Sequence, residues 1–200
     1  MKASPNQRSL STIAVAGIFT VAILALGYFA FGFWTMLIFA SGFFVGLVFW
    51  LFIKSNTPYR EIKNLFWATM LLFLLHRIEE KQFGFFAFLS QVTGVPTPEI
   101  TSWSVIGLVL LSVGGWLSIP YFFKRGNEIG YYLAWTFFCA MGITELAHWV
   151  VFPFLTNQPF AYIPGMATVV ILAPVSWIGL WRLWRKRVYP HSKLHFKKHL

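Results

Sequence analysis

Residues 13–53 read IAVAGIFTVAILALGYFAFGFWTMLIFASGFFVGLVFWLFI, a run with no acidic, basic or histidine side chain. One helical crossing of a bilayer needs about 20 apolar residues, so this run is long enough for two. It predicts a first span from Thr12 to Ala30 and a second from Phe33 to Lys54, with Gly27 and Gly32 flanking the turn. The basic start before the run resembles a signal peptide. Because no polar stretch follows to release a mature chain, we interpret the run as a hairpin that stays in the membrane.

The rest of the chain continues the alternation of apolar runs and short polar loops. Of its 200 residues, 58% are hydrophobic and 11% are charged, whereas about a quarter of the residues in a soluble domain are charged. We therefore predict an all-α, polytopic transmembrane bundle of about six helices. The four later helices are expected at roughly 61–82, 100–123, 129–154 and 162–184.

Basic residues mark the orientation of this bundle. The chain has 16 Lys and Arg residues and a formal net charge of +10. All of them except Arg77 and Lys81 fall on the side that carries both termini in a six-span topology. The positive-inside rule then places both termini in the cytoplasm and the protein in the cell membrane. Basic residues at the ends of apolar runs contact membrane lipid, and we expect no nucleic-acid partner.

Ionisable residues inside the predicted spans form two short motifs. The first is His76-Arg-Ile-Glu79-Glu80, and the second is Glu145-Leu-Ala-His148. Residues three or four apart share one face of a helix. Each motif is about 15 residues into an outward-running helix, so both should lie at one depth in the outer half of the membrane. Because buried charges are costly in a bilayer, these five residues are the candidate catalytic residues.

Imidazole and carboxylate groups in this combination are typical of metal sites. His76, Glu80, Glu145 and His148 are the expected ligands, either of zinc or of a di-iron or di-manganese pair. Without a metal, the same groups could shuttle protons. Two structural alternatives remain open. Glu79 and Glu80 could form solvated ion pairs with basic neighbours, and Glu145 with His148 could be a packing hydrogen bond.

Three further features carry weaker signals. Gly42 and Gly46 have the spacing that lets membrane helices approach closely. The segment Tyr162–Thr168 opens the last helix, where free N–H groups could bind an anion. The tail has three histidines among lysines, His191, His195 and His199, which we interpret as a basic segment attracted to anionic lipid.

The motif His76-Arg-Ile-Glu-Glu80 resembles the signature of the HXXEE family of small membrane proteins. His148 and the Pro-Gly of 162–168 fit the later elements of that family, and the resemblance covers roughly 65–178. The chain departs from the pattern in having Phe83-Gly-Phe-Phe after the acidic pair and Glu145 where an Asn is expected. The resemblance covers only the middle of three expected parts, which are a hairpin at 1–54, an HXXEE-like four-helix domain at 61–180 and a basic tail at 181–200. It implies an enzyme but no particular reaction.

The leading hypothesis is a membrane-embedded enzyme that acts on a lipid-like or hydrophobic substrate near the outer leaflet. Metal-dependent hydrolysis, oxidation and acid–base isomerisation all stay open. No Ser or Cys nucleophile stands beside a base, which argues against covalent catalysis. The alternatives are a proton- or ion-coupled transporter and a non-catalytic accessory membrane subunit. The sequence does not fix the oligomeric state.

Overall fold

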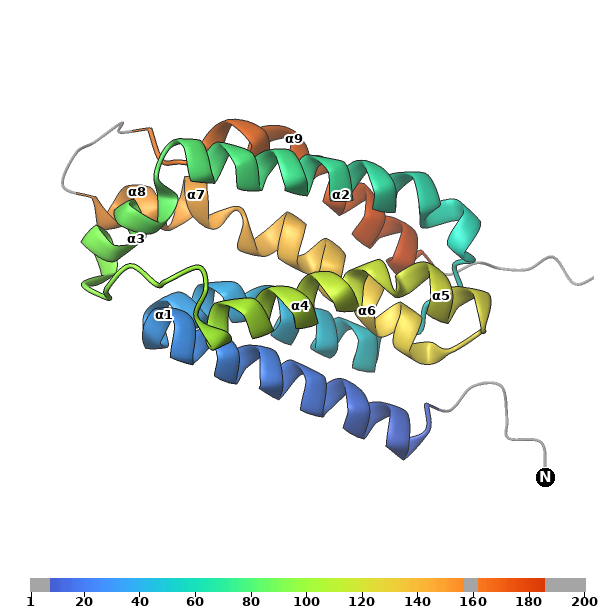
Figure 1. The fold of residues 1–200 in the computed structure, drawn as a ribbon. Helices are drawn as coiled ribbons and strands as arrows, with labels where there is room; N and C mark the ends of the chain where they lie inside the picture. The colour runs from blue at the N-terminus through green and yellow to red at the C-terminus, as the bar shows by residue number, and fades with distance from the viewer. Residues whose placement is uncertain (1–7, 157–161, 186–200) are drawn as a thin grey trace, which may run out of the picture.

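The computed structural model describes residues 8–156 and 162–185, and within these ranges the chain forms helices without a strand (Figure 1). The histidines of the tail lie outside the described residues. The helices, in chain order, are α1 (Leu10–Phe52), α2 (Tyr59–Gln82), α3 (Phe85–Thr93), α4 (Trp103–Leu117), α5 (Ile119–Lys124), α6 (Glu128–Cys139), the π-helix η1 (Ala140–Thr144), α7 (Ala147–Val150), α8 (Phe152–Leu155) and α9 (Met166–Trp184).

Helix α1 is a hairpin of two arms that reverses direction at Gly32. This residue has φ 73° and ψ −180°, a backbone conformation that only glycine adopts readily. The two ends of α1 meet again: Arg8 donates hydrogen bonds to the carbonyl oxygens of Leu51, at 2.7 Å, and Ile53, at 3.0 Å. The turn therefore lies between the two spans that the apolar run predicts.

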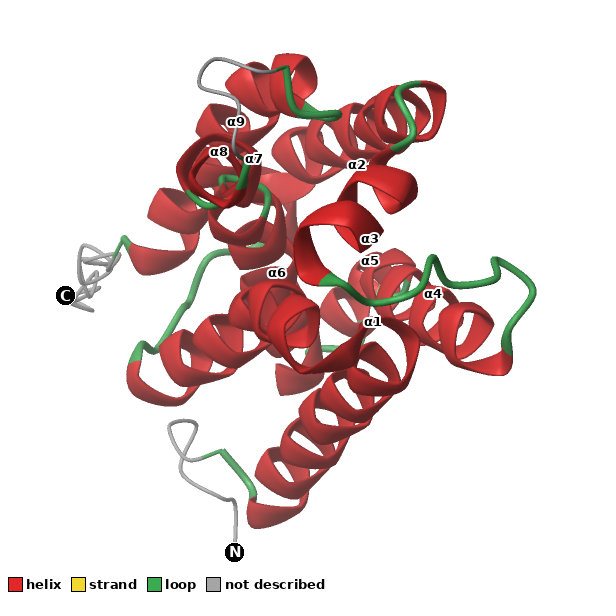
Figure 2. Ribbon diagram, turned by 90° about the vertical axis from the view of Figure 1, so that its left-hand side faces the viewer, coloured by secondary structure: helices red, strands yellow, loops and turns green. Residues whose placement is uncertain are grey.

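Helix α6 occupies the centre of the bundle, as the view along the helices shows (Figure 2). Its residues from Tyr132 to Cys139 are all buried. The second arm of α1 packs closely on it because Gly42 and Gly46 present no side chain. A Cβ at Gly42 would come within 2.4 Å of the Cα of Ala140, and one at Gly46 within 2.5 Å of the Cα of Thr136. The close approach predicted from the spacing of these glycines is thus present.

Within the described residues, four helical segments are long and apolar enough to cross a membrane: Leu10–Phe39, Trp103–Lys124, Glu128–Leu155 and Met166–Trp184. The remaining arm of the hairpin, Ser41–Phe52, is apolar but shorter. Helix α2 runs beside α9 along the length of the bundle (Figure 1) and carries several charged residues. The chain is thus an all-α protein with membrane-spanning character, while the count of six crossings stays a prediction.

Several expected helices are interrupted rather than continuous. The segment expected at 129–154 contains α6, η1, α7 and α8, and the segment expected at 100–123 breaks at Ser118, before Pro120. The last helix begins at Met166 rather than near Tyr162, because Gly165 at φ 99° is not helical. These interruptions lie next to the residues of the candidate site or at prolines, where helices commonly bend.

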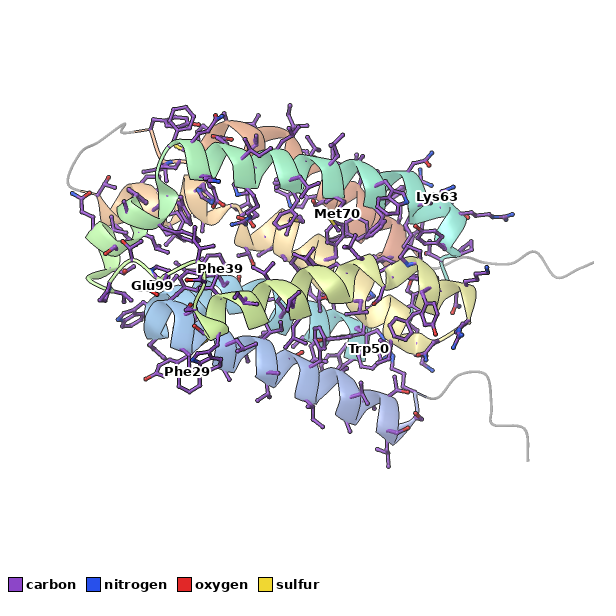
Figure 3. All side chains as sticks on the ribbon, viewed as in Figure 1. Phe29, Phe39, Trp50, Lys63, Met70 and Glu99 are labelled. Atoms are coloured by element: carbon purple, nitrogen blue, oxygen red, sulfur yellow. The ribbon has the colours of Figure 1, made fainter. Side chains whose placement is uncertain are left out.

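Both ends of the described chain lie at one end of the bundle. Phe49, near the end of α1, contacts Trp184 at the end of α9 with ring centroids 5.9 Å apart. Thr57 donates a hydrogen bond to the carbonyl oxygen of Arg182 at 2.6 Å. Lys63 marks this end, and Glu99 marks the opposite end (Figure 3).

Candidate metal centre

Helix α2 contributes His76 and Glu80, one turn apart on its buried face. The relative exposure of His76 is 0%, and that of Glu80 is 5%. Burial of both residues excludes the alternative in which Glu80 forms a solvated ion pair at the membrane interface. The spacing of four residues places the Nε2 of His76 3.5 Å from the Oε1 of Glu80.

The π-helical segment η1 directs Glu145 and His148 toward α2. The backbone N–H of Glu145 donates to the carbonyl oxygen of Ala140, five residues earlier, at 3.2 Å. Such a π-bulge inserts one extra residue into a helical turn and is frequent at functional sites. Here it rotates the downstream residues relative to the buried face of α6. As a result, Glu145 and His148 are buried on the side of His76.

Four ligand atoms from these two elements converge on one point. They are the Nε2 atoms of His76 and His148, the Oε1 of Glu80 and the Oε2 of Glu145, all within 4.8 Å of one another. The Oε2 of Glu145 is 3.1 Å from His76 and 3.6 Å from His148. The Oε1 of Glu80 is 3.3 Å from His148. A zinc ion with bonds of about 2.0–2.1 Å has ligand atoms about 3.3–3.4 Å apart, and these four histidine–carboxylate distances are close to that spacing.

Arg77 holds the outer oxygen of each carboxylate. Its Nη1 donates to the Oε2 of Glu80 at 2.5 Å, and its Nη2 donates to the Oε1 of Glu145. The guanidinium therefore leaves one oxygen of each glutamate directed at the two histidines. It also offsets only one of the two buried negative charges, so the cluster favours a further positive charge, from a proton or a metal ion.

Thr168, in the first turn of α9, orients the ring of His76. Its hydroxyl donates to the Oε2 of Glu79 at 2.5 Å and lies 2.8 Å from the Nδ1 of His76. Because the single hydroxyl hydrogen is directed at the carboxylate, Thr168 accepts the Nδ1–H of His76. The lone pair or second proton of the imidazole is then on Nε2, which faces the four-atom cluster. A second hydrogen bond of this kind is usual for metal-binding histidines.

Glu79 of α2 does not belong to the four-atom cluster. Its carboxylate instead contacts the N-terminus of α9. Its carboxylate accepts from the backbone N–H groups of Gly165 at 3.1 Å, Ala167 at 3.1 Å and Thr168 at 2.9 Å, and from the hydroxyl of Tyr162. The anion expected at this helix start is therefore the protein's own side chain. Glu79 is buried, so the solvated ion pair considered for it is also excluded.

Gly165 brings the start of α9 into contact with both imidazole rings. A Cβ on this residue would lie 2.6 Å from the Cε1 of His76 and 2.7 Å from the Cε1 of His148. The rings themselves meet edge to face, with centroids 4.9 Å apart. Phe85 of α3 and Phe152 of α8 cover the other side of His148, with centroids 4.9 and 5.3 Å away. The cluster is thus enclosed by apolar rings and by backbone.

Four of the five predicted catalytic residues come together, and Glu79 supports them from the side. The sequence analysis did not name Arg77 or Thr168 as candidate site residues, although both contact cluster residues. Arg77 stands three residues before Glu80, which was the one available signal. No family model matches the chain, and no curated protein or solved structure matches it either.

Proposed function

We propose that the protein is a membrane-embedded metalloenzyme with one zinc ion held by His76, Glu80, Glu145 and His148. The observation that carries the proposal is the convergence of four buried ligand atoms, from two separate helical segments, within 4.8 Å of one another. A di-iron or di-manganese pair fits less well. Carboxylates that bridge two ions use both oxygens, and here Arg77 occupies the second oxygen of each glutamate.

The donor set supports hydrolysis of a lipid-like substrate by a metal-activated water. Two histidines and a glutamate hold catalytic zinc in several hydrolases, with water at the fourth position. The Oε1 of Glu80 is buried and accepts no hydrogen bond from a described residue. It is therefore the ligand atom that would most readily give way to a water and accept its proton, as a general base.

The location of the centre is part of the proposal. With both termini in the cytoplasm and the chain in the cell membrane, the cluster lies in the outer half of the bilayer. The same residues carry the resemblance to the HXXEE family, which we propose as the relationship of this chain. A substrate reaching the cluster from the lipid phase would be hydrophobic or lipid-like.

Elemental analysis of the purified protein tests the metal centre directly. The wild-type chain, solubilised in detergent without chelators, should contain about one zinc per chain. Glu145→Gln and His148→Ala should lose it, because each removes one ligand atom. Glu99→Gln is the matched control, since Glu99 is exposed at the loop before α4 and far along the chain from the cluster.

The fold of each variant must be compared by circular dichroism and by elution from a sizing column. Zinc in the wild type and in Glu99→Gln, with none in the two folded cluster variants, supports the proposal. A wild-type protein free of zinc, iron and manganese under these conditions would contradict it. The four side chains would then form a proton-sharing network that packs α2 against α7.

A further inference from the structure

An apolar cavity of about 170 Å³ lies between the hairpin α1 and helices α2, α4 and η1. Its wall is largely aromatic and aliphatic, with Phe31, Phe39, Phe43, Leu108, Val113 and Trp116 among its residues. Phe39 is labelled in Figure 3, where it lies in the interior of the bundle. The apolar part of such a cavity is suited to apolar ligands.

Two charged residues belong to the same wall, Arg77 and Glu145. Glu145 is the one cluster residue among those that line the cavity, so the cavity reaches the four-atom cluster at this side chain. Arg77 has five N–H donors, and its ion pairs with Glu80 and Glu145 leave the Nε–H without a partner among the described residues. The cavity therefore offers an apolar surface and, next to it, a cationic group suited to a carbonyl or ester oxygen.

The size of the cavity limits what fits in it. An engineered protein cavity of about 150 Å³ holds one benzene molecule. The cavity here is slightly larger, so it accommodates a flexible chain segment of roughly six to eight carbons. The rigid fused rings of a sterol are too large for it, and so is the body of a two-chain phospholipid.

We propose that this cavity binds one acyclic hydrocarbon chain of the substrate and places the polar group at its end beside Arg77 and the metal ion. The inference deepens the proposed function and rests on it for the reaction. The binding of the chain, however, depends on the cavity alone. The substrate class would be a single-chain amphiphile with a hydrolysable carbonyl group, such as an acyl ester or amide.

Two substitutions would fill part of the cavity while keeping the other contacts of the substituted residues. A Cβ at Gly27 would meet Met36 at 3.5 Å, an ordinary contact, so Gly27→Val adds bulk to the wall. Ser112 donates to the carbonyl oxygen of Leu108 in its own helix, so Ser112→Leu breaks no contact between helices. Gly17→Val and Gly114→Leu are controls on the same two helices, where an added Cβ meets nothing within 4 Å.

The test uses palmitic acid that carries a diazirine at about its sixth carbon, within the part of the chain that the cavity holds, added to the full-length protein in nanodiscs. After illumination, peptides from α1 and α4 that line the cavity should carry the label. Labelling should fall about tenfold or more in Gly27→Val and in Ser112→Leu, because each displaces several methylene groups. Gly17→Val and Gly114→Leu should label like the wild type. Unlabelled hexadecanol should compete, and cholesterol should not.

The outcomes separate this inference from the metal centre, because zinc content is measured on the same samples. One outcome would overturn the cavity proposal alone. In it the protein retains zinc, the label spreads over lipid-facing residues, and Gly27→Val and Ser112→Leu do not reduce the labelling. Competition by cholesterol as strong as by hexadecanol would also overturn it. A zinc-free wild type whose cavity still labels, with the loss in both filled variants, would support the chain site while contradicting the metalloenzyme.

Discussion

At the scale of the residue, the candidate site depends on the side chains that orient the four cluster residues as much as on those four residues themselves. Glu79 accepts three backbone N–H groups of the α9 N-terminus and the hydroxyl of Thr168. A carboxylate at a helix N-terminus is stabilised by the helix dipole, so this contact fixes α9 against α2. The hydroxyl of Thr168 in turn accepts a hydrogen bond from the Nδ1 of His76 and so directs the Nε2 of that ring toward the cluster.

Thr168→Val should weaken zinc binding by about 10- to 100-fold, the usual cost of losing a hydrogen bond behind a metal-binding histidine. Valine matches threonine in shape but gives His76 no acceptor for its Nδ1–H. Thr168→Ser, which keeps the hydroxyl, should bind zinc nearly as the wild type does. Competition with a fluorescent zinc chelator measures both affinities. Equal affinities for Thr168→Val and the wild type would contradict the role assigned to the hydroxyl.

Gly165→Ala should abolish the centre. Its Cβ would lie 2.6 Å from one imidazole and 2.7 Å from the other, in addition to the strain of φ 99°. Gly94→Ala is the control for strain alone, because Gly94 has φ 70° but open space around its Cβ position. That control should cost about 1–2 kcal/mol of unfolding free energy and keep its zinc. Zinc retained by Gly165→Ala would show that the loop before α9 does not pack on the histidines as described.

The sequence allowed His76, Glu80, Glu145 and His148 to be predicted as neighbours, because two short motifs at one depth offer few other pairings. The expected ligand set contained Glu80 and not Glu79, although the spacing from His76 allowed either. Adjacent residues on a helix point about 100° apart, so one glutamate faces α7 and the other faces the start of α9. The partner of each is decided by tertiary packing, which no local spacing encodes.

At the scale of the element, apolar runs predicted where the helices lie, and glycine and proline predicted most of their ends. The π-helix η1 could not be predicted from the run at 129–154. The extra residue in this turn lets α6 keep its buried face in the core while Glu145 and His148 contact residues of α2. The close pairing of the second arm of α1 with α6 is different, because the glycine spacing was visible in the sequence.

Gly42→Leu and Gly46→Leu should each destabilise the protein strongly, since the added side chain would collide with backbone atoms of η1 or α6. Gly17→Leu, on the first arm of the same hairpin, should leave stability unchanged because its Cβ position is open. Thermal unfolding in detergent, followed by loss of the monodisperse peak, ranks the three variants. Equal melting temperatures for Gly46→Leu and Gly17→Leu would contradict the helix pairing.

At the scale of the whole molecule, orientation in the membrane decides which leaflet supplies the substrate. Among the described residues, Arg77 and Lys81 lie toward the end of the bundle with Glu99, whereas the basic residues at the start of α2 and at the ends of α5 and α9 lie at the end with Lys63 (Figure 1, Figure 3). Asn56 is exposed at that end and Thr97 is exposed in the loop at the other end. The one native thiol, Cys139, is fully buried, so it should not react with a polar reagent.

Cysteines introduced at these two positions should therefore report the orientation of the protein in the membrane, because the native cysteine does not react. In intact cells, a membrane-impermeant maleimide should label Thr97→Cys and leave Asn56→Cys unlabelled. After the membrane is opened, both should react, while the wild type should stay unlabelled throughout. The positive-inside rule supplies the reason, because basic loops resist translocation. The reverse pattern would place the metal cluster in the cytoplasmic half of the bilayer, and the substrate would then have to come from the inner leaflet.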